Sequence, residues 1–320
     1  MNMHLENLKN KLDIITQCIE DKNDVIFLDT PLYYNVGDIL IYEGTMRYFK
    51  DKGVAIKKDI PKEFFDPERL SIYITNKTTI ILQGGGNFGD IYPAHQMLRE
   101  AVIKYFPNNR IIQLPQTMFF SKQENVVNAI SVFKQHTNIV MFARDMPTLK
   151  IFQQLTDKAY LMPDMAHYLY GNLPLAKSTT RDVLLFIRKD VEAASDQNQL
   201  INAEGCYVDW ADLVTKKDKI ILKVVRKVKS LSTKLDIEIF DKIATFIWRS
   251  NSTYLASKFA KFFSSYKKVV TSRLHGHILS CIVETPSELI DNNYGKNTAY
   301  YDTWTKPLTF TSKLKVPDVD

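Results

Sequence analysis

Three cationic side chains in the second half of the sequence each follow a short apolar run, and a histidine stands close to one of them. The cations are Arg188, Arg273 and Lys296, and the histidine is His275. Short apolar runs of this kind suit parallel strands, whose carboxyl ends meet at one edge of a sheet. Arginine binds carboxylate and phosphate groups through paired hydrogen bonds, and a helix N-terminus beside it also favours anions. We therefore expect a site for a small, multiply charged anion, with His275 placed to transfer a proton near neutral pH.

A polar motif, Asn-Val-Gly-Asp at 35–38, follows an apolar run in the first half and precedes an expected helix. Asn35 and Asp38 are good N-cap residues, and Gly37 lets a ligand approach the backbone. Both a plain helix cap and a functional site fit this motif.

A glycine-rich motif, Gly-Gly-Gly-Asn-Phe-Gly, begins two residues after the apolar run at 79–82. It satisfies the G-x-G-x-x-G fingerprint of dinucleotide-binding folds, which also needs an acidic residue about 20 residues further on to hold the ribose. No Asp or Glu stands between Glu100 and Glu124, so we reject a nicotinamide site. Two interpretations stay open, a turn that lines a cleft or a close contact between a strand and a helix.

The elements that must position these residues alternate along the chain. Short apolar runs stand at 25–29, 54–58, 79–82, 110–114, 139–142, 160–162, 182–188, 206–209, 269–272 and 287–291. Helical patterns separate them, such as 39–50, 94–106, 124–136 and 146–155. An amphipathic helix is expected at the start of the chain from Leu5, Leu8, Leu12, Ile15 and Ile19. This alternation predicts an α/β fold with parallel sheets.

Length and turn residues predict two domains. The chain has 320 residues, which exceeds the usual size of a single hydrophobic core. The segment 170–180 gathers Gly, Pro, Ser and Thr without periodicity, so we place a linker there. The expected architecture is two doubly wound, Rossmann-like domains that face each other across a cleft, one at 1–172 and the other at 180–320.

The composition excludes several classes of protein. Of the residues, 45% are hydrophobic and 24% are charged, which is ordinary for a globular protein and unlike disordered or low-complexity chains. Cys18, Cys206 and Cys281 are far apart and form no C-x-x-C motif, so we expect neither a disulfide framework nor a zinc site. We also expect no metal, because no His, Cys and Asp cluster has the spacing of metal ligands. Neither a secretory signal nor a membrane span is recognisable, so we expect a cytoplasmic protein that could also lie on the inner membrane face.

One stretch accounts for the whole excess of positive charge. Residues 216–234 contain eight basic residues and one acidic residue, whereas the net charge of the whole chain is +6. The apolar residues that recur there at helical spacing are Ile220, Ile221, Val224, Val225, Val228, Leu231 and Leu235. Such a stripe fits a helix on an anionic membrane surface, and equally a surface helix with solvated lysines. We expect no nucleic-acid partner, because the remaining surface lacks the charge and no binding motif is present.

Taken together, the motifs resemble the polysaccharide pyruvyl transferase family. The matching elements are the motif at 35–38, the glycines at 84–86, Ala-Arg-Asp at 143–145, Pro-Asp at 163–164, Arg-Leu-His at 273–275 and the run at 291–296. The last two are the more specific, and the combination is most similar to the subgroup found in bacterial exopolysaccharide and capsule gene clusters. The family resembles two-domain glycosyltransferases of the GT-B type. This implies an acceptor-side domain at 1–172 and a phosphoenolpyruvate-side domain at 180–320 with a basic helical insertion at 216–268.

The resemblance implies that pyruvate passes from phosphoenolpyruvate onto two hydroxyls of a sugar, forming a ketal. The residues expected to bind phosphoenolpyruvate are Arg188, Arg273, Leu274 and Lys296. The residues expected on the acceptor side of the cleft are Asn35, Gly37, Gly84, Gly85, Gly86, Asn87, Arg144 and Asp164. Protonation of the donor is assigned to His275, and Asp38 is the expected base. No cofactor is implied, since phosphoenolpyruvate is a co-substrate, and the expected acceptor is an oligosaccharide on undecaprenyl diphosphate at the inner membrane face.

Two other functions fit parts of the sequence. A nucleotide-sugar glycosyltransferase of the GT-B type has the same architecture, but it often has acidic residues near the donor ribose, where cations dominate here. A non-catalytic, membrane-associated scaffold of polysaccharide assembly would have no reason to gather Arg188, Arg273 and His275 at strand ends. Because the fold alone does not determine function, the distinction rests on these side chains.

Overall fold

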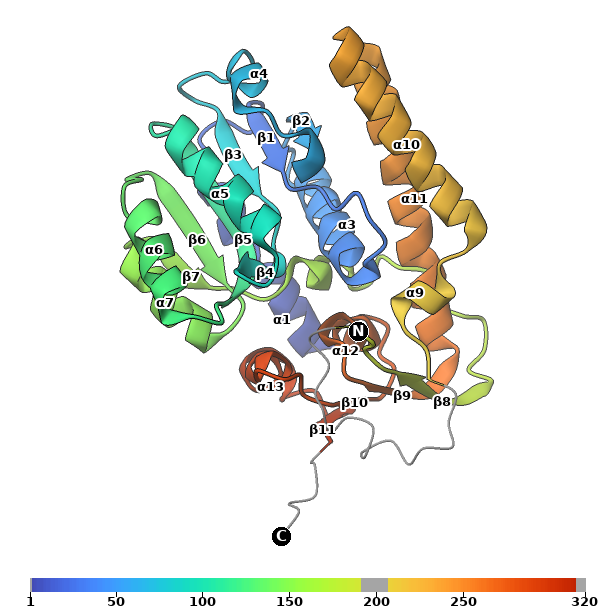
Figure 1. The fold of residues 1–320 in the computed structure, drawn as a ribbon. Coiled ribbons are helices and arrows are strands. Elements are labelled where there is room, and N and C mark those ends of the chain that lie inside the picture. The colour runs from blue at the N-terminus through green and yellow to red at the C-terminus, as the bar shows by residue number, and fades with distance from the viewer. Residues whose placement is uncertain (1, 191–206, 315–320) are drawn as a thin grey trace.

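A computed structural model describes residues 2–190 and 207–314 of the chain. It contains two parallel β-sheets, one built from residues 25–161 and the other from residues 181–313, with helices packed against them (Figure 1). The predicted α/β fold with parallel sheets is confirmed. Within the described residues, the segment 170–180 that joins the two sheets contains no helix or strand.

The first sheet has seven strands, and each strand pairing in it is parallel. The strand order is β2-β1-β3-β5-β6-β7, and β4 pairs with β5. The strands are β1 (Val25–Leu28), β2 (Ile56–Ile60), β3 (Thr79–Leu82), β4 (Gly85–Gly89), β5 (Arg110–Phe119), β6 (Ile139–Ala143) and β7 (Ala159–Leu161). β1, β3 and β6 are buried along their whole length, as expected for parallel strands that are covered on both faces.

Two separate cores flank the first sheet. One contains residues of α5 (Pro93–Tyr105), α6 (Gln123–Phe133), α7 (Met146–Leu155) and α4 (Pro67–Ser71). The other contains residues of α1 (Met3–Lys11), α2 (Ile14–Gln17), α3 (Val36–Asp51) and the 3₁₀ helix η2 (Met165–Leu169). Neighbouring strand residues point to opposite faces, so Ile80 belongs to the first core and Ile81 to the second. Short apolar strands can therefore bury every side chain.

The second sheet is smaller and is also parallel, in the order β11-β10-β9-β8. Its strands are β8 (Arg181–Phe186), β9 (Tyr266–Thr271), β10 (Ser287–Leu289) and β11 (Thr311–Lys313). The helices that follow its strands are α9 (Trp210–Leu213), α12 (Leu274–Ile282) and α13 (Lys296–Tyr300), the last continued by the π-helical segment η3 (Tyr301–Thr305). The order of strands and helices predicted from the apolar runs therefore extends into this half.

A long helical hairpin joins α9 to β9. It consists of α10 (Lys216–Leu235) and α11 (Glu238–Ser264), and α10 lies beside the first sheet in Figure 1. The turn places Asp236 in the left-handed region, with φ 55°. Arg249 of α11 contacts the buried carboxylate of Asp59 at the first sheet, 2.9 Å from Nη2 to Oδ2. No helix in the described residues combines the length and the apolar content needed to cross a membrane.

The last helical segments of the chain return to the first sheet. Trp304 Nε1 donates to the carbonyl of Arg144, which follows β6 (2.6 Å). Tyr300 Oη accepts from the backbone nitrogen of Asp164, which follows β7 (3.1 Å). The second half of the chain therefore holds two loops of the first half in place.

Several local features differ from the sequence-based expectations. The glycine-rich motif forms a strand, β4, and β11 was not expected. The opening helix is divided into α1 and α2, although its five apolar residues are buried as predicted. Of the expected strand at 206–209, Cys206 lies outside the described residues, and Val208 forms an isolated parallel bridge with Phe186.

Candidate active site

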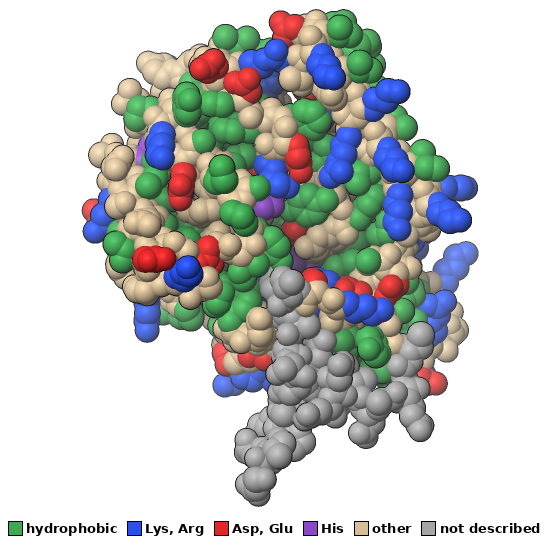
Figure 2. All heavy atoms as spheres, viewed as in Figure 1, with side chains coloured by type: hydrophobic (Ala, Val, Ile, Leu, Met, Phe, Trp, Pro, Cys, Tyr) green, Lys and Arg blue, Asp and Glu red, His purple; other side chains and the backbone are tan. Residues whose placement is uncertain are grey.

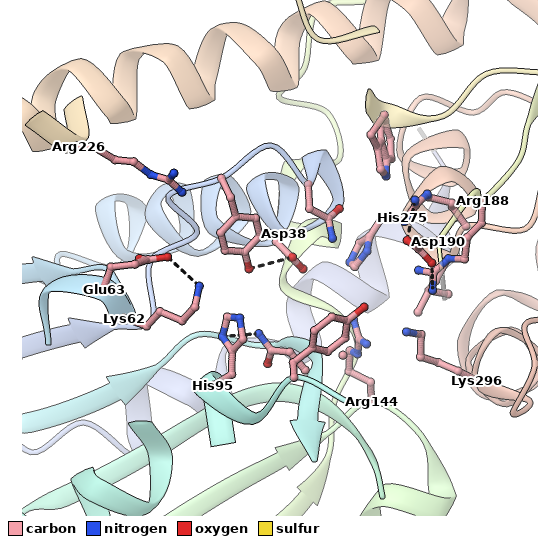
Figure 3. A pocket seen from close by; sticks show the side chains of 18 residues that line it. Asp38, Lys62, Glu63, His95, Arg144, Arg188, Asp190, Arg226, His275 and Lys296 are labelled. Atoms are coloured by element: carbon pink, nitrogen blue, oxygen red, sulfur yellow. Dashed lines mark hydrogen bonds and ion pairs between the residues drawn. The ribbon is translucent and has the colours of Figure 1, made fainter. Parts of the chain in front are cut away.

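A cavity of about 400 Å³ lies at the carboxyl ends of the two sheets (Figures 2 and 3). Residues that follow strands of both sheets line it. The predicted residues that line it are Asn35, Asp38, Gly86, Asn87, Arg144, Arg188, Arg273, Leu274, His275 and Lys296. The other predicted residues are Gly37, Gly84, Gly85 and Asp164. Of these, Gly37 and Asp164 lie against His275. The structure therefore gathers most of the predicted residues in one place.

Arg188 and Arg273, which follow β8 and β9, lie on either side of the Asp190 carboxylate. Arg188 Nη1 is 3.4 Å from Asp190 Oδ1, and Arg273 Nη2 is 2.9 Å from Asp190 Oδ2. Arg273 also forms a two-point ion pair with the buried Asp209, in which both N–O distances are 2.5 Å. Although burial alone would lower the pKa of Arg273, these carboxylates raise it. The two guanidinium groups are held close together, and an anion that binds both must compete with Asp190.

Cations from both halves of the chain converge at Gly86. A Cβ atom at this position would lie 3.0 Å from Lys296 Nζ and 3.2 Å from Arg144 Nη2. Lys296 Nζ also donates to the hydroxyl of Tyr294, at 3.0 Å. A side chain larger than glycine would push the two cations apart, so Gly86 permits their close approach.

His275 lies in the first turn of α12 and faces the N-terminus of α3. A Cβ atom at Gly37 would lie 2.6 Å from His275 Nδ1, so a glycine is needed there for the two halves to meet. His275 Nε2 lies 3.4 Å from Asp164 Oδ2. The imidazole therefore contacts the first half of the chain on two sides.

The second histidine of the same helix has a different environment. His277 is fully buried, and its two ring nitrogens lie 3.0 Å from Ser287 Oγ and 2.8 Å from Thr305 Oγ1. Burial lowers the pKa of His277 to about 3, so this ring is neutral at physiological pH. Of the two histidines in the motif, His275 is thus the one available for chemistry in the cavity.

Asp164 and Arg144 form an ion pair in which both side chains are fully buried, with 2.5 Å between Asp164 Oδ2 and Arg144 Nη1. Burial alone would raise the pKa of Asp164, but the Arg144 guanidinium and His275 hold it well below its usual range. Thr117 Oγ1 accepts from Arg144 Nη2, at 3.1 Å. Asp164 therefore stays ionised and presents a negative charge to His275.

Asp38 lies on the first-sheet side of the cavity, in the first turn of α3. Tyr33 Oη donates to Asp38 Oδ2 at 3.1 Å, and Asn35 caps the helix by accepting from the nitrogen of Gly37. Burial, followed by the carboxylates of Asp38 and Asp29, raises the pKa of Tyr33 well above its usual value. Tyr33 is therefore a neutral donor that orients the Asp38 carboxylate.

The glycine-rich motif has two roles that differ by residue. A Cβ atom at Gly84 would lie 2.5 Å from the carbonyl oxygen of Pro115, which makes Gly84 a packing residue between neighbouring strands. Gly85 has φ 133° and would place a Cβ atom 3.6 Å from Asp38 Oδ1. Gly86 and Asn87, in contrast, line the cavity.

Eight lining residues were not expected from the sequence: Tyr33, Lys62, Glu63, Tyr92, His95, Asp190, Trp210 and Arg226. Arg226 reaches the cavity from α10 and donates to the carbonyl of Leu32 at 2.7 Å. The sequence showed that Arg226 belongs to a basic stretch. It did not show that Arg226 contacts Leu32, because the two residues are far apart in the sequence. For His95, the only signal was its position at the start of a helix after the glycine-rich motif.

The cavity combines two chemical environments. Its second-sheet side is cationic and contains His275, which suits a small anion that receives a proton. Its first-sheet side contains Tyr33, Tyr92, Asn35 and carboxylates, which suit a neutral compound with several hydroxyls. In the part of the chain that the structure describes, no three His, Cys, Asp or Glu side chains gather so that they could hold a metal ion.

Comparisons with known proteins identify relatives over most of the chain. The family described as "Polysaccharide pyruvyl transferase" matches residues 35–294. "Putative pyruvyl transferase EpsO" of Bacillus subtilis (strain 168) is 34% identical, over 97% of this chain and 94% of its own length. "Pyruvyl transferase 1" of Schizosaccharomyces pombe is 28% identical, over 89% of this chain and 66% of its own length.

A solved structure covers almost the whole chain and shares its fold. It is the crystal structure of a Klebsiella pneumoniae protein that is described as functionally uncharacterized. Its TM-score is 0.65 at 20% identity, and the alignment covers 97% of this chain and 99% of that one. At this identity the likeness concerns the arrangement of the elements, and it includes both sheets.

Proposed function

The chain belongs to the polysaccharide pyruvyl transferase family, and from this premise we propose that it transfers pyruvate from phosphoenolpyruvate onto two hydroxyls of a sugar as a ketal. The acceptor is a precursor of an exopolysaccharide or capsule. The observation that supports this donor most is that His275 shares one cavity with Arg188, Arg273 and Lys296. A nucleotide-sugar glycosyltransferase or a scaffold would fit the fold, but family membership favours pyruvyl transfer.

Phosphoenolpyruvate is a three-carbon compound with a carboxylate and a phosphate, so it needs cations at two places. Arg188 and Arg273 neutralise these groups, and Lys296 provides a third cation beside Gly86. Asp190 lies 3.4 and 2.9 Å from the two guanidinium groups and must give way when the donor binds. The two arginines therefore exchange the Asp190 carboxylate for the anionic groups of the donor, so that both have an anionic partner before and after binding.

The reaction begins with a proton that His275 gives to the methylene carbon of the donor. The neighbouring carbon becomes electron-poor, and a sugar hydroxyl attacks it while Asp38 accepts the hydroxyl proton. Phosphate then leaves with the electron pair of its carbon–oxygen bond, and a second hydroxyl closes the ketal. Asp164 Oδ2, 3.4 Å from His275 Nε2, contacts the imidazole and helps to hold it in place.

We further propose that α10 brings the protein to an anionic membrane surface, where a lipid-linked acceptor would lie. The predicted apolar stripe is divided: Val225 is buried, whereas Ile220 is 59% exposed and Leu235 is 57% exposed. Lys223 and Lys227 are exposed on an adjacent strip of the same helix, and basic side chains extend along α10 in Figure 2. Apolar and cationic side chains that are exposed side by side suit an anionic bilayer interface.

Arg188→Ala is expected to weaken phosphoenolpyruvate binding by roughly 10- to 100-fold, because a charge-assisted bond to the donor is lost. Asp190→Asn is expected to have the opposite effect, since it removes the carboxylate that competes with the donor. Lys189→Ala is the matched control, because Lys189 pairs with Asp212 at 2.6 Å and does not line the cavity. Titration calorimetry measures all three. Weaker binding in Asp190→Asn would contradict the proposed competition.

His275→Ala is expected to lower turnover by about 10²–10⁴ or more, the usual contribution of a positioned acid. Phosphoenolpyruvate binding should largely persist, because the arginines are unchanged. Turnover is followed by phosphate release in the presence of acceptor, and calorimetry with the donor shows that the variant is folded. Full activity of this variant would remove His275 from the mechanism.

Purified protein is expected to float with vesicles that contain anionic lipid, and this binding should weaken as salt rises. Lys223→Gln/Lys227→Gln should bind less. Lys104→Gln/Lys150→Gln, which changes two exposed lysines of α5 and α7, should bind as the unaltered protein does. Flotation that ignores lipid charge, or equal loss in both double variants, would exclude the role of α10.

A further inference from the structure

A histidine–aspartate pair on the first-sheet side of the cavity is not part of the mechanism described above. His95 lies in the first turn of α5 and is 7% exposed, and Asp29 follows β1 and is 1% exposed. His95 Nδ1 is 2.8 Å from both carboxylate oxygens of Asp29. Two acceptor oxygens at this distance favour the tautomer with the proton on Nδ1, in which Nε2 has the lone pair.

One neighbour of the pair competes with Asp29 for the same ring nitrogen. Asn87 Oδ1 accepts from Arg99 and Gln116, which turns the donor Nδ2 of the same amide toward His95 Nδ1, at 3.0 Å. A bond to a buried carboxylate is stronger than one from a neutral amide, so the proton stays between His95 and Asp29. Among the described residues, no hydrogen bond from a protein group to His95 Nε2 occurs, and His95 lines the cavity.

Asp29 is held in a conformation that costs backbone energy. Its φ is 68°, in the left-handed region that residues other than glycine rarely adopt. The fully buried Arg99 places Nη2 3.6 Å from Asp29 Oδ2, so the carboxylate has a second charged partner. Strained residues of this kind persist where the surroundings fix them, and they gather at active sites. Here the left-handed conformation of Asp29 places its carboxylate beside His95.

The pair lies close to the expected base. Tyr33 donates to Asp38, and the ring of the same tyrosine meets the His95 ring edge to face, with 6.2 Å between centroids. Asp38 and His95 therefore flank Tyr33 on one side of the cavity, and Figure 3 shows both facing the cavity from the first-sheet side. Ketal formation breaks two O–H bonds of the acceptor, and one carboxylate accepts only one proton at a time.

We propose that His95, oriented by Asp29, is a second catalytic base that takes the proton of one acceptor hydroxyl through Nε2. This inference rests on the pyruvyl transfer proposed above. As one hydroxyl oxygen bonds to the central carbon of the donor, its proton passes to His95, and the proton of the other hydroxyl passes to Asp38. One of these protons restores the acid His275, and the other leaves with the phosphate, so the two hydroxyl protons are accounted for.

Chemical rescue tests this role. His95→Gly is expected to lower turnover by about 10²–10⁴ without changing phosphoenolpyruvate binding. Added imidazole should restore part of the turnover in His95→Gly, but not in Asp38→Asn, whose lost base is on the other side of Tyr33. His95→Gln keeps most of the side-chain volume but has no base, so it should lose turnover and resist rescue. Asp29→Asn should lose turnover and keep donor binding.

Two results would overturn the inference. One is turnover of the unaltered level in His95→Gln. The other is a His95→Gly protein that binds phosphoenolpyruvate normally and shows no response to imidazole. If the unaltered protein itself forms no ketal from phosphoenolpyruvate, the proposed function fails instead, and the two failures are thereby distinguished.

Discussion

The buried ion pair between Arg144 and Asp164 is the interaction on which the site depends most. Removing two charges from water is costly, and their attraction offsets the cost only when further hydrogen bonds satisfy both groups. Arg144 donates a further hydrogen bond to the hydroxyl of Thr117, and the backbone nitrogen of Ala166 donates to Asp164 Oδ1 at 2.8 Å. Loss of one partner would leave a buried charge unpaired, at a cost of roughly 3–5 kcal/mol. Because Asp164 also contacts His275, this pair in the first half helps to position an imidazole of the second.

The same pair shows why the two halves of the chain act together. Trp304 and Tyr300 bind the backbone of Arg144 and Asp164, so the end of the chain fixes the loops that follow β6 and β7. Gly37 and Gly86 permit side chains of the second half to approach within contact distance. In the proposed reaction, a donor bound at the second sheet and a sugar bound at the first would therefore lie next to each other.

The elements could be predicted better than the contacts between them. β3 and α7 begin and end at the predicted residues, because apolar periodicity reports burial directly. β4 was missed because glycine is a poor strand former. The cations at strand ends were predicted together, since parallel strands share a carboxyl edge. In contrast, the pairs Arg273–Asp209 and His95–Asp29 join residues 64 and 66 positions apart, and no local pattern encodes such contacts.

The central claim is that an acid in this cavity protonates the methylene carbon of phosphoenolpyruvate while two hydroxyls of one sugar replace the phosphate. Mass spectrometry of a lipid-linked oligosaccharide, incubated with protein and phosphoenolpyruvate in heavy water, measures this most directly. The account predicts a cyclic pyruvate ketal whose methyl group contains a single deuterium from the solvent. A product that keeps the carbon–carbon double bond, or a ketal whose methyl group contains no deuterium, would contradict it.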